Sequence, residues 1–438
     1  MQKELKTIKS LIPRTAVFKM AKNPVDFLIK HQKKTGSLYR IDAPVKFIIV
    51  SDPEYIKHML QTNWRNYQKG AAYDGFKLFL GNGILASEGD LWRKNRKLIQ
   101  PSFSKERIKS IANIVDETAL KWSNKWLQQS KQKETIEVKY EMLEFTLEVI
   151  SNAMMGKEET QLYKPLFIPL FQSEYDFVLK RNMSLFKMPL WVPIRSHIKF
   201  KKAKKVVDDI LYSLIDSKEK HEDDTMLSEI LRAKDVNGEG MSKPQLRDEF
   251  MTIFAAGFET TGTSLAWCFL LLAKHPEFQQ KLYDEIKGIN LGKSDAVFRS
   301  PWLNAFLSET LRLYPSAWIV SRKNVKEDVI DGQRIPKKST IFVSIFGMHR
   351  DSRYWDRPEK FDPERFINAE QNPSYHPYGV GPRKCIGSYF SHTIMLYILY
   401  HMVSKFEISL ADDRGFEMDA KISLKPKGDV NLSLKPRG

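Results

Sequence analysis

The fold of this chain is decided by the stretch His376-Pro377-Tyr378-Gly379-Val380-Gly381-Pro382-Arg383-Lys384-Cys385-Ile386-Gly387. Two glycines and a proline before the cysteine prevent regular helix or sheet up to that point. From Ser388 to Phe406 apolar residues recur at helical spacing, so Cys385 precedes a helix N-terminus, where backbone N–H groups favour a thiolate. A single thiolate on a rigid loop suits an axial ligand of haem iron, because such a ligand needs one strong donor and a clear approach.

This cysteine loop has two other interpretations. A lone cysteine after a Gly-Pro turn is often a small buried apolar residue, and it can also be a catalytic nucleophile. The surrounding residues favour a ligand, because the loop resembles the haem-binding loop of the cytochrome P450 superfamily, aromatic-Gly-x-Gly-x-Arg-x-Cys-x-Gly. Every fixed position matches, although Tyr378 stands where phenylalanine is usual. The resemblance implies that Cys385 ligates the iron of haem b and that Tyr378, Arg383 and Gly387 contact this cofactor.

Composition excludes several classes of protein. The 438 residues carry a net charge of +17, which suits nucleic acid, an anionic membrane or an acidic protein as partner. No segment resembles a nucleic-acid-binding module, so we expect no nucleic acid partner. The two cysteines, Cys268 and Cys385, are too few for a disulfide scaffold or a multi-cysteine metal cluster, and they fit a reducing compartment.

The organisation of the chain indicates one domain. No Gly/Ser-rich linker or internal repeat divides it, so we predict a single domain over residues 1–438. We expect a mainly α-helical fold with a small β region, and the resemblance places haem between a long central helix and the helix after the cysteine loop. The longest uninterrupted apolar run, Leu265 to Ala273, is too short for a membrane span, and the N-terminus lacks the apolar core of a signal peptide. These features predict a cytoplasmic monomer without a transmembrane anchor.

A second motif lies in the middle of that long predicted helix. Helical character runs from a capping sequence at Ser242 to about Lys274 and includes Ala255-Ala256-Gly257-Phe258-Glu259-Thr260-Thr261-Gly262-Thr263. Small and polar residues here indicate either a notch for packing another helix or a functional site. The motif matches the oxygen-activation motif of the superfamily. The resemblance implies that Gly257 leaves room for dioxygen, that Thr260 donates a hydrogen bond during O–O cleavage and that Glu259 helps to deliver protons.

Two further segments resemble parts of the superfamily that bind the haem propionates. Trp92 and Arg96 are four residues apart and therefore share one face of a predicted helix. Taken alone, they fit a solvated basic helix with one buried tryptophan. The resemblance implies that both reach a propionate, and that Arg322, at the end of the segment Ser316 to Arg322, does the same.

Three charged residues are expected to stabilise the fold. Glu309 and Arg312 lie three residues apart on a predicted helix and can pair on its surface. Downstream, Asp362-Pro363-Glu364-Arg365-Phe366 resembles the meander motif of the superfamily. By that resemblance Arg365 completes a structural triad with Glu309 and Arg312.

The sequence does not define the substrate, and fatty acids, terpenoids, steroids and methoxylated compounds all remain open. Aromatic residues favour an apolar ligand, whereas a charged turn, predicted at Lys427-Gly428-Asp429 within a hairpin over Lys421 to Pro436, suits a polar group. Two other segments are predicted to be irregular: a flap with two prolines over Lys187 to Ile194, and a mobile charged segment over His221 to Asp235. The candidate substrate contacts are Phe76, Phe254, Ala317, Ile319 and Asp429.

The resemblance extends over essentially the whole chain and implies a monooxygenase. Such an enzyme inserts one atom of dioxygen into a C–H bond, by hydroxylation or oxidative dealkylation, and releases the other atom as water. The sequence contains no flavin or iron–sulfur domain, so we expect electrons from a separate ferredoxin or flavodoxin with its reductase. This partner would dock near Arg93, Lys94, Lys97 and Lys384.

Two functions from other classes remain as alternatives. One is a haem-thiolate peroxygenase or isomerase that needs no electron partner, against which the Glu259-Thr260 pair argues. The other is a non-enzymatic helical binding protein that carries the cysteine loop by chance.

Overall fold

The structure is a computed structural model that describes residues 4–9, 23–42, 46–70, 73–184, 188–289, 296–367, 372–412 and 415–437. Its contacts divide the chain into two compact units: unit 1 (Met1–Gly70, Val115–Thr146 and Glu259–Gly438) and unit 2 (Ala71–Ile114 and Leu147–Phe258). Helices α7 (Ala112–Lys131), α8 (Val138–Met155) and α12 (Lys243–Lys274) each have residues in both units. The single domain predicted over residues 1–438 stays a prediction.

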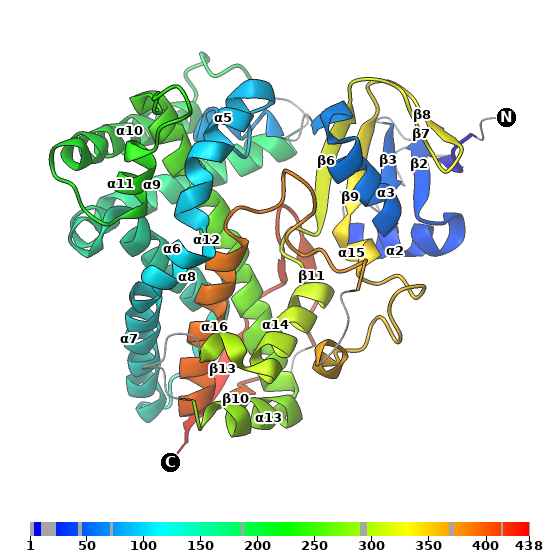
Figure 1. Cartoon of the computed structure of the whole chain (residues 1–438). Coiled ribbons are helices and arrows are strands. Elements are labelled where there is room, and N and C mark those ends of the chain that lie inside the picture. Colours follow the sequence, from blue (N-terminus) through cyan, green and yellow to red (C-terminus); the bar gives the residue numbers. More distant parts are fainter. Residues whose placement is uncertain are drawn as a thin grey trace. The chain divides into compact units, whose positions relative to one another are not determined.

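Unit 1 contains a six-stranded sheet built from short apolar runs (Figure 1). Strands β2 and β3 pair antiparallel, with Leu38 opposite Val50, and β3 pairs parallel with β9. Alternate residues point to opposite faces, so Leu38 and Ile48 pack in one core cluster while Tyr39 and Ile49 pack in another. In spatial order the strands are β1 (Thr7–Lys9), β2 (Leu38–Asp42), β3 (Phe47–Val50), β9 (Thr340–Ser344), β6 (Ile319–Asn324) and β4 (Tyr67–Lys69).

Capped helices cover both faces of this sheet. Helix α2 (Pro24–Thr35) begins at Asn23, whose side chain accepts the N–H of Asp26, and ends at Gly36 with φ +94°. Its Val25 and Leu28 pack in one cluster, and Ile56 of α3 (Pro53–Lys57) packs in the other. The sequence predicts a helix between Asn23-Pro24 and Gly36, a strand pair over 38–41 and 46–50, and a short helix opening at Ser51-Asp52-Pro53, and the structure confirms all three.

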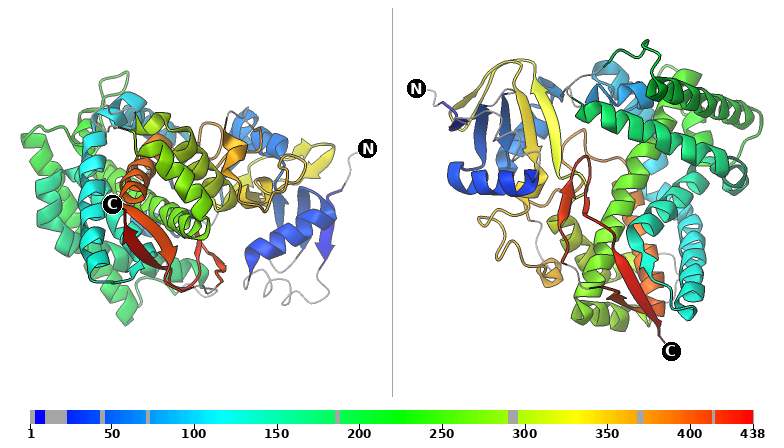
Figure 2. Two further views of the ribbon diagram at one scale, coloured as in Figure 1. Left: turned by 90° about the horizontal axis from the view of Figure 1, so that it is seen from below. Right: turned by 180° about the vertical axis from the view of Figure 1, so that it is seen from behind.

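The rest of unit 1 is mainly helical. It includes α13 (Pro276–Ile286), α14 (Pro301–Leu313) and α16 (Ser388–Lys405), the helix predicted after the cysteine loop. A second, three-stranded sheet has the order β10 (Phe406–Leu410), β13 (Asn431–Pro436) and β5 (Ile136–Glu137), with β13 seen in red near the C-terminus in Figure 2.

Unit 2 is helical and has an aromatic core. Helix α9 (Lys157–Met183) and helix α12 each present phenylalanines at intervals of four residues, which lie on one helix face. Phe171 contacts Phe254 and Phe258, with ring centroids 5.2 and 5.5 Å apart. Figure 1 shows α9 beside α10 (Arg195–Lys220) and α11 (Met226–Arg232), in green. Helix α5 (Gly89–Ile99) also belongs to this unit.

Short elements complete both units. They are η1, a π-helix (His58–Thr62), η2 (Trp64–Asn66), α4 (Lys77–Leu80), η4 (Gln100–Phe103), α6 (Lys105–Ser110), η5 (Val297–Arg299), β7 (Asp328–Ile330), β8 (Gln333–Ile335), α15 (Ile345–Met348), η6 (Pro363–Phe366), β11 (Met418–Ala420) and β12 (Leu424–Pro426).

The predicted fold class, mainly α with a small β region, is confirmed, but two local predictions are wrong. The segment 421–436 is no hairpin, because β12 pairs with β11 while β13 pairs with β10 and β5. The segment 221–235 contains helix α11, which begins at a Thr225 cap and buries Met226, Leu227 and Ile230. The flap prediction agrees with the absence of helix over 188–194, and Lys187 lies outside the described residues.

Candidate functional site

The backbone of the cysteine loop in unit 1 is held by its glycines. Gly379 and Gly381 have φ values of +74° and +76°, which favour glycine. A Cβ on Gly381 would lie 2.0 Å from the carbonyl oxygen of Leu60 in η1, so only glycine fits there. The N–H of Cys385 donates to the carbonyl of Tyr378 at 2.9 Å. The loop therefore presents Cys385 from a fixed backbone just before α16.

The two cysteines differ in accessibility. Cys385 is exposed, whereas Cys268 is fully buried in α12. Burial raises the pKa of the Cys268 thiol to about 12, which disfavours a thiolate there. Cys385 is therefore the thiol that can reach an exogenous group, and it lies two residues before Gly387, the N-cap of α16.

A buried histidine connects the start of the loop to α14. The N–H of His376 donates to Nε2 of His349 at 3.0 Å, so this nitrogen is the acceptor. Nδ1 of His349 lies 3.0 Å from the carbonyl oxygen of Arg312 and therefore carries the proton. Burial lowers the pKa of His349 to about 3, so the ring stays neutral and keeps this tautomer near pH 7.

The predicted structural triad is brought together around one buried carboxylate. Arg312 donates from Nε and Nη2 to the two oxygens of Glu309, at 2.6 and 2.8 Å, and both residues have no exposed surface. Arg365 Nε donates to the same carboxylate at 3.1 Å, as does the backbone N–H of Asp362 at 2.9 Å. Arg312 Nη1 also donates to the carbonyls of His349 and Pro358. One ion pair thus connects α14, the segment 358–365 and His349.

The oxygen-motif residues lie at the centre of α12, which is helical from Lys243 to Lys274 as predicted. Ala256 and Thr260, four residues apart and therefore on one face, are exposed, although the residues at 251–255 and 261–272 are buried. The carbonyl of Thr260 accepts hydrogen bonds from the hydroxyls of Ser264 and Ser316, at 3.0 and 2.8 Å. These contacts fix the backbone at the accessible part of the helix.

Glu259 contacts Ser423, which lies in the predicted hairpin segment 421–436 but outside its predicted turn at 427–429. Its carboxylate accepts a hydrogen bond from the hydroxyl of Ser423 at 2.9 Å. Burial raises the pKa of Glu259, although this hydrogen bond and the nearby Lys425 oppose the shift. Ser423 follows β11 in the turn 421–423, so this turn reaches α12.

Two glycines of α12 allow close packing on α8. A Cβ on Gly257 would lie 2.7 Å from Cδ1 of Ile150, and one on Gly262 would lie 3.0 Å from the carbonyl oxygen of Met142. The packing-notch interpretation therefore has direct support. The predicted role of Gly257 in leaving room for dioxygen stays a prediction.

Arg322 is a buried cation on β6. Its side chain is 7% exposed, and its Nη1 donates to the carbonyl of Ser321 at 2.8 Å. Among the described residues no carboxylate lies within ion-pair distance of it. A buried guanidinium without a counter-charge is unfavourable, so this position suits an anionic group of a ligand.

Trp92 and Arg96 belong to unit 2, on α5. Trp92 is buried, and Arg96 is partly exposed. Asn95, between them in the sequence, donates to Oε1 of the buried Glu249 of α12 at 3.0 Å, and the other oxygen of Glu249 accepts the N–H of Ile84. The orientation of α5 within unit 2 is therefore fixed by a residue of α12.

The candidate substrate residues have different environments. Ala317 is exposed, and Ile319 and Phe76 are partly buried. Phe254 has no exposed surface and packs in the aromatic core, so its role in this structure is packing. Asp429 is exposed in the 427–429 turn, 4.0 Å from Lys139, and its predicted place in a hairpin tip is wrong. Trp318 is buried and donates from Nε1 to the carbonyl of Lys421 at 3.1 Å.

The residues of unit 1 fit a haem group. Among the described residues no group of three or more His, Cys, Asp or Glu could hold a metal ion, so a protein-only metal cage is not present there. A single accessible thiol and a buried arginine without an acid match instead a cofactor with one axial position and anionic substituents. This donor set is compatible with iron porphyrin.

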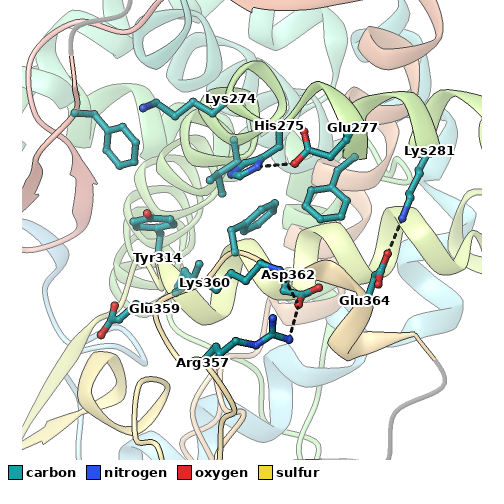
Figure 3. Close-up of a pocket in the computed structure, with 15 residues that line it drawn as sticks. Lys274, His275, Glu277, Lys281, Tyr314, Arg357, Glu359, Lys360, Asp362 and Glu364 are labelled. Atoms are coloured by element: carbon teal, nitrogen blue, oxygen red, sulfur yellow. Dashed lines mark hydrogen bonds and ion pairs between the residues drawn. The ribbon is translucent and has the colours of Figure 1, made fainter.

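Figure 3 shows a pocket of unit 1 that is separate from these residues. Its volume is about 720 Å³, and it lies between the end of α12, the start of α13 and the segment 357–364. Most of its charged side chains are paired, for example Lys281 with Glu364 at 2.5 Å and His275 with Glu277 at 3.0 Å. None of the predicted site residues lines it.

Comparisons with known proteins show the family of this chain. The Cytochrome P450 family model matches residues 12–431. The putative cytochrome P450 132 of Mycobacterium tuberculosis is 27% identical, covering 88% of this chain and 87% of the relative. The cyclooctatin synthase of Streptomyces melanosporofaciens is 28% identical (85% and 83% covered). Protein LUTEIN DEFICIENT 5, chloroplastic, of Arabidopsis thaliana is 27% identical (86% and 68% covered).

The chain belongs to the cytochrome P450 family. It is therefore an oxidoreductase of the haem-thiolate monooxygenase class, which uses haem iron, dioxygen, an organic substrate and a redox partner. No helix in the described part of the chain is long and apolar enough to cross a membrane.

Sequence reasoning missed the side chains that hold the predicted residues in place. His349 was singled out only because the segment Met348 to Asp351 resembles a superfamily segment near the haem edge, and its hydrogen bonds to Arg312 and His376 were not predicted. Ser316, Ser264 and Ser423 gave no signal, because serines at these positions gain meaning only from contacts between distant segments.

The buried carboxylate of Glu309 provides a stability test. Glu309→Ala leaves Arg312 buried without its counter-charge, and we expect a loss of about 3–5 kcal/mol in the free energy of unfolding. Chemical denaturation followed by circular dichroism measures it. The control Glu407→Ala removes an exposed partner of Lys435 and should cause no measurable change. An equally small effect of both substitutions would contradict the role given to the triad.

Proposed function

We propose that this protein holds haem b through Cys385 and inserts one oxygen atom into a C–H bond of a small organic substrate, by hydroxylation or oxidative dealkylation. The observation that carries the proposal is the accessible Cys385 thiol on a glycine-fixed loop before α16. When bound, thiolate-ligated haem supplies the O–O cleavage chemistry of the family.

Other residues are assigned to the cofactor by their environment and by the family motifs. Arg322 has no acid within ion-pair distance among the described residues and would bind a haem propionate. Trp92, Arg96 and Arg383 would also bind the propionates. Tyr378, whose carbonyl accepts the N–H of Cys385, and Gly387 belong to the cysteine loop and would pack against the macrocycle. Glu309, Arg312 and Arg365 would keep the loop in place without touching substrate.

Glu259 and Thr260 would deliver the protons that the reaction consumes. The raised pKa of Glu259 lets its carboxyl keep a proton closer to neutral pH, which suits a group that gives up a proton and regains it from solvent. Ser423 holds this carboxyl, and the hydroxyls of Ser264 and Ser316 hold the carbonyl of Thr260. Thr260, exposed on α12, would donate its hydroxyl hydrogen bond toward the reacting oxygen.

The substrate would meet apolar side chains. Ala317 and Ile319 are accessible in unit 1, and Ile422, next to Ser423, is 37% exposed. Phe76 stays a proposed substrate contact on the sequence alone. These side chains favour an apolar C–H substrate that binds by burial of surface. Because Asp429 lies on another turn and near Lys139, a polar substrate group there has little support.

Electrons would come from a separate ferredoxin or flavodoxin with its reductase, and the protein would act as a cytoplasmic monomer. Two of the four cations expected to dock the partner are neutralised: Arg93 pairs with Asp90, and Lys94 pairs with Asp235 and Glu239. Lys97 and Lys384 remain exposed. Lys384, next to Cys385, is therefore the stronger candidate for contact with an acidic partner.

Thr260→Ala tests the proton assignment. The variant should bind substrate and be reduced normally, but product formed per electron should fall about tenfold, with hydrogen peroxide released instead, because a hydrogen-bond donor is lost. Product and peroxide are measured together during turnover. The control Thr261→Ala removes the hydroxyl that contacts Ser391 and should stay coupled. Tight coupling in Thr260→Ala would mean that protons travel another way, and efficient turnover with peroxide alone would favour a peroxygenase.

Lys384→Glu tests the partner. Reduction by an acidic ferredoxin or flavodoxin should slow about tenfold at low salt and lose much of its salt dependence, because a favourable charge contact becomes repulsive. Stopped-flow absorbance measures the rate, and Lys33→Glu, an exposed change on α2, is the control. Equal rates for both variants would contradict the assignment of Lys384.

A further inference from the structure

The segment 81–84, which follows α4, lies directly on helix α12 within unit 2. It has no regular secondary structure. A Cβ on Gly81 would lie 2.1 Å from Cγ of Asp248, and one on Gly83 would lie 2.6 Å from the carbonyl oxygen of the same residue. The two glycines therefore allow the backbone of the segment to approach the side chains of α12 closely.

Three polar side chains of α12 bind the backbone of this segment. Oδ2 of Asp248 accepts the N–H of Asn82 at 2.7 Å, and Oε2 of Glu249 accepts the N–H of Ile84 at 2.8 Å. Nε2 of Gln245 donates to the carbonyl of Asn82 at 3.2 Å and to Oε1 of Glu249 at 2.9 Å. Two consecutive acids thus hold alternate N–H groups of the segment.

Glu249 differs from Asp248 because it also holds α5. Its Oε1 accepts a hydrogen bond from the side-chain amide of Asn95 at 3.0 Å. Glu249 and Asn95 are each 1% exposed, so water does not compete for this contact. One carboxyl therefore joins the segment 81–84, α5 and α12.

The contact with Asn95 also bears on two residues that are proposed to bind haem. Asn95 lies three residues after Trp92 and directly before Arg96, within the eleven residues of α5. A helix of this length moves as one body, so a shift of Asn95 moves Trp92 and Arg96 with it. The bond between Asn95 and Glu249 therefore determines where these two side chains lie within unit 2.

We propose that Glu249 is a positioning residue for haem binding: by holding the segment 81–84 and α5 on α12, it keeps Trp92 and Arg96 in place for the propionates. This inference rests on the proposed function, because that function assigns both residues to haem. Glu249 is given no contact with haem or substrate, and it acts through Asn95.

Protonation of Glu249 changes how firmly it holds the two elements. Burial raises its pKa to about 8, and Asp248 acts in the same direction, whereas its hydrogen bonds oppose the shift. The groups that bind it from the segment and from α5 are uncharged amides. When the segment and α5 lift off, water reaches the carboxyl and its pKa returns toward the ordinary value of 4.5. The closed arrangement therefore binds the proton more tightly, so opening becomes easier as pH rises from about 4.5 to about 8.

Hydrogen exchange of the full chain, followed by mass spectrometry, measures this opening. Glu249→Leu leaves the N–H of Ile84 and the amide of Asn95 without their acceptor. Peptides covering 82–86 should then exchange about tenfold faster, the effect of one lost buried hydrogen bond. In the wild type, exchange corrected for its intrinsic rate should rise between about pH 5 and about pH 8. In Glu249→Gln it should not depend on pH, because an amide does not titrate there.

Transfer of haem from the holoenzyme to apomyoglobin measures how firmly haem is held. Asn95→Ala removes the contact with α5 but leaves the N–H of Ile84 bonded to Glu249. Haem should therefore leave this variant about tenfold faster, while exchange over 82–86 stays close to that of the wild type. Glu249→Leu should change both measurements. The reduced carbon monoxide spectrum should be the same in every variant, because the thiolate ligand is unchanged.

Glu174→Gln is the matched control. Glu174 is another fully buried acid of unit 2 whose pKa burial raises to about 8. Neither of its oxygens has a hydrogen-bond partner in the described part of the chain, so it holds no segment in place. This variant should match the wild type in haem transfer and in exchange over 82–86. Thermal unfolding establishes that all variants are folded.

Three results would overturn the proposal. They are exchange over 82–86 in Glu249→Leu as slow as in the wild type, haem transfer from Asn95→Ala as slow as from the wild type, and equal changes in Glu174→Gln. A wild type that binds no haem would contradict the proposed function and remove the link to haem. Faster exchange in Glu249→Leu would then still support the hold of Glu249 on the segment, so the two failures are distinguishable.

Discussion

The buried carboxylate of Glu309 is the interaction on which the rest of the candidate site depends. It joins Arg312 on α14 to Arg365 and the N–H of Asp362. The carbonyl of Arg312 then fixes the His349 tautomer, and Nε2 of His349 accepts the N–H of His376, the first residue of the cysteine loop. Because each donor in this series of hydrogen bonds has its acceptor, the cysteine loop starts from one defined position. Its glycines then determine the backbone path to Cys385.

The parts of the fold that could be predicted are those specified locally. Asn23 and Gly36 delimit α2, and glycines with positive φ shape the cysteine loop, so neighbouring residues were enough. The predicted 421–436 hairpin failed for the opposite reason. A Lys-Gly-Asp turn suits a hairpin, but β12 forms a local hairpin with β11 across residues 421–423. Strand β13 pairs instead with the distant strands β10 and β5, and such long-range pairing depends on packing that neighbouring residues do not specify. Thr225, a good N-cap, was the overlooked signal for α11.

The candidate site shows the same difference between features specified by neighbouring residues and features that depend on distant segments. Motif spacing predicts that Cys385 and Thr260 carry chemistry, and the exposed positions of both are compatible with those roles. It could not predict the residues that orient them, because Ser423 reaches Glu259 across 164 positions of sequence. Nor could it separate Phe254 from the substrate contacts, since an aromatic residue on a helix has the same pattern whether it lines a pocket or packs in a core.

The most direct test of the central claim, thiolate ligation of haem by Cys385, is the absorption spectrum of the purified, dithionite-reduced protein with carbon monoxide. We predict a strongly red-shifted Soret band for the wild type and for Cys268→Ala, whose thiol is buried, and loss of that shift in Cys385→Ser. A wild type without haem, a haem spectrum without the shift, or a shift that persists in Cys385→Ser would contradict the account.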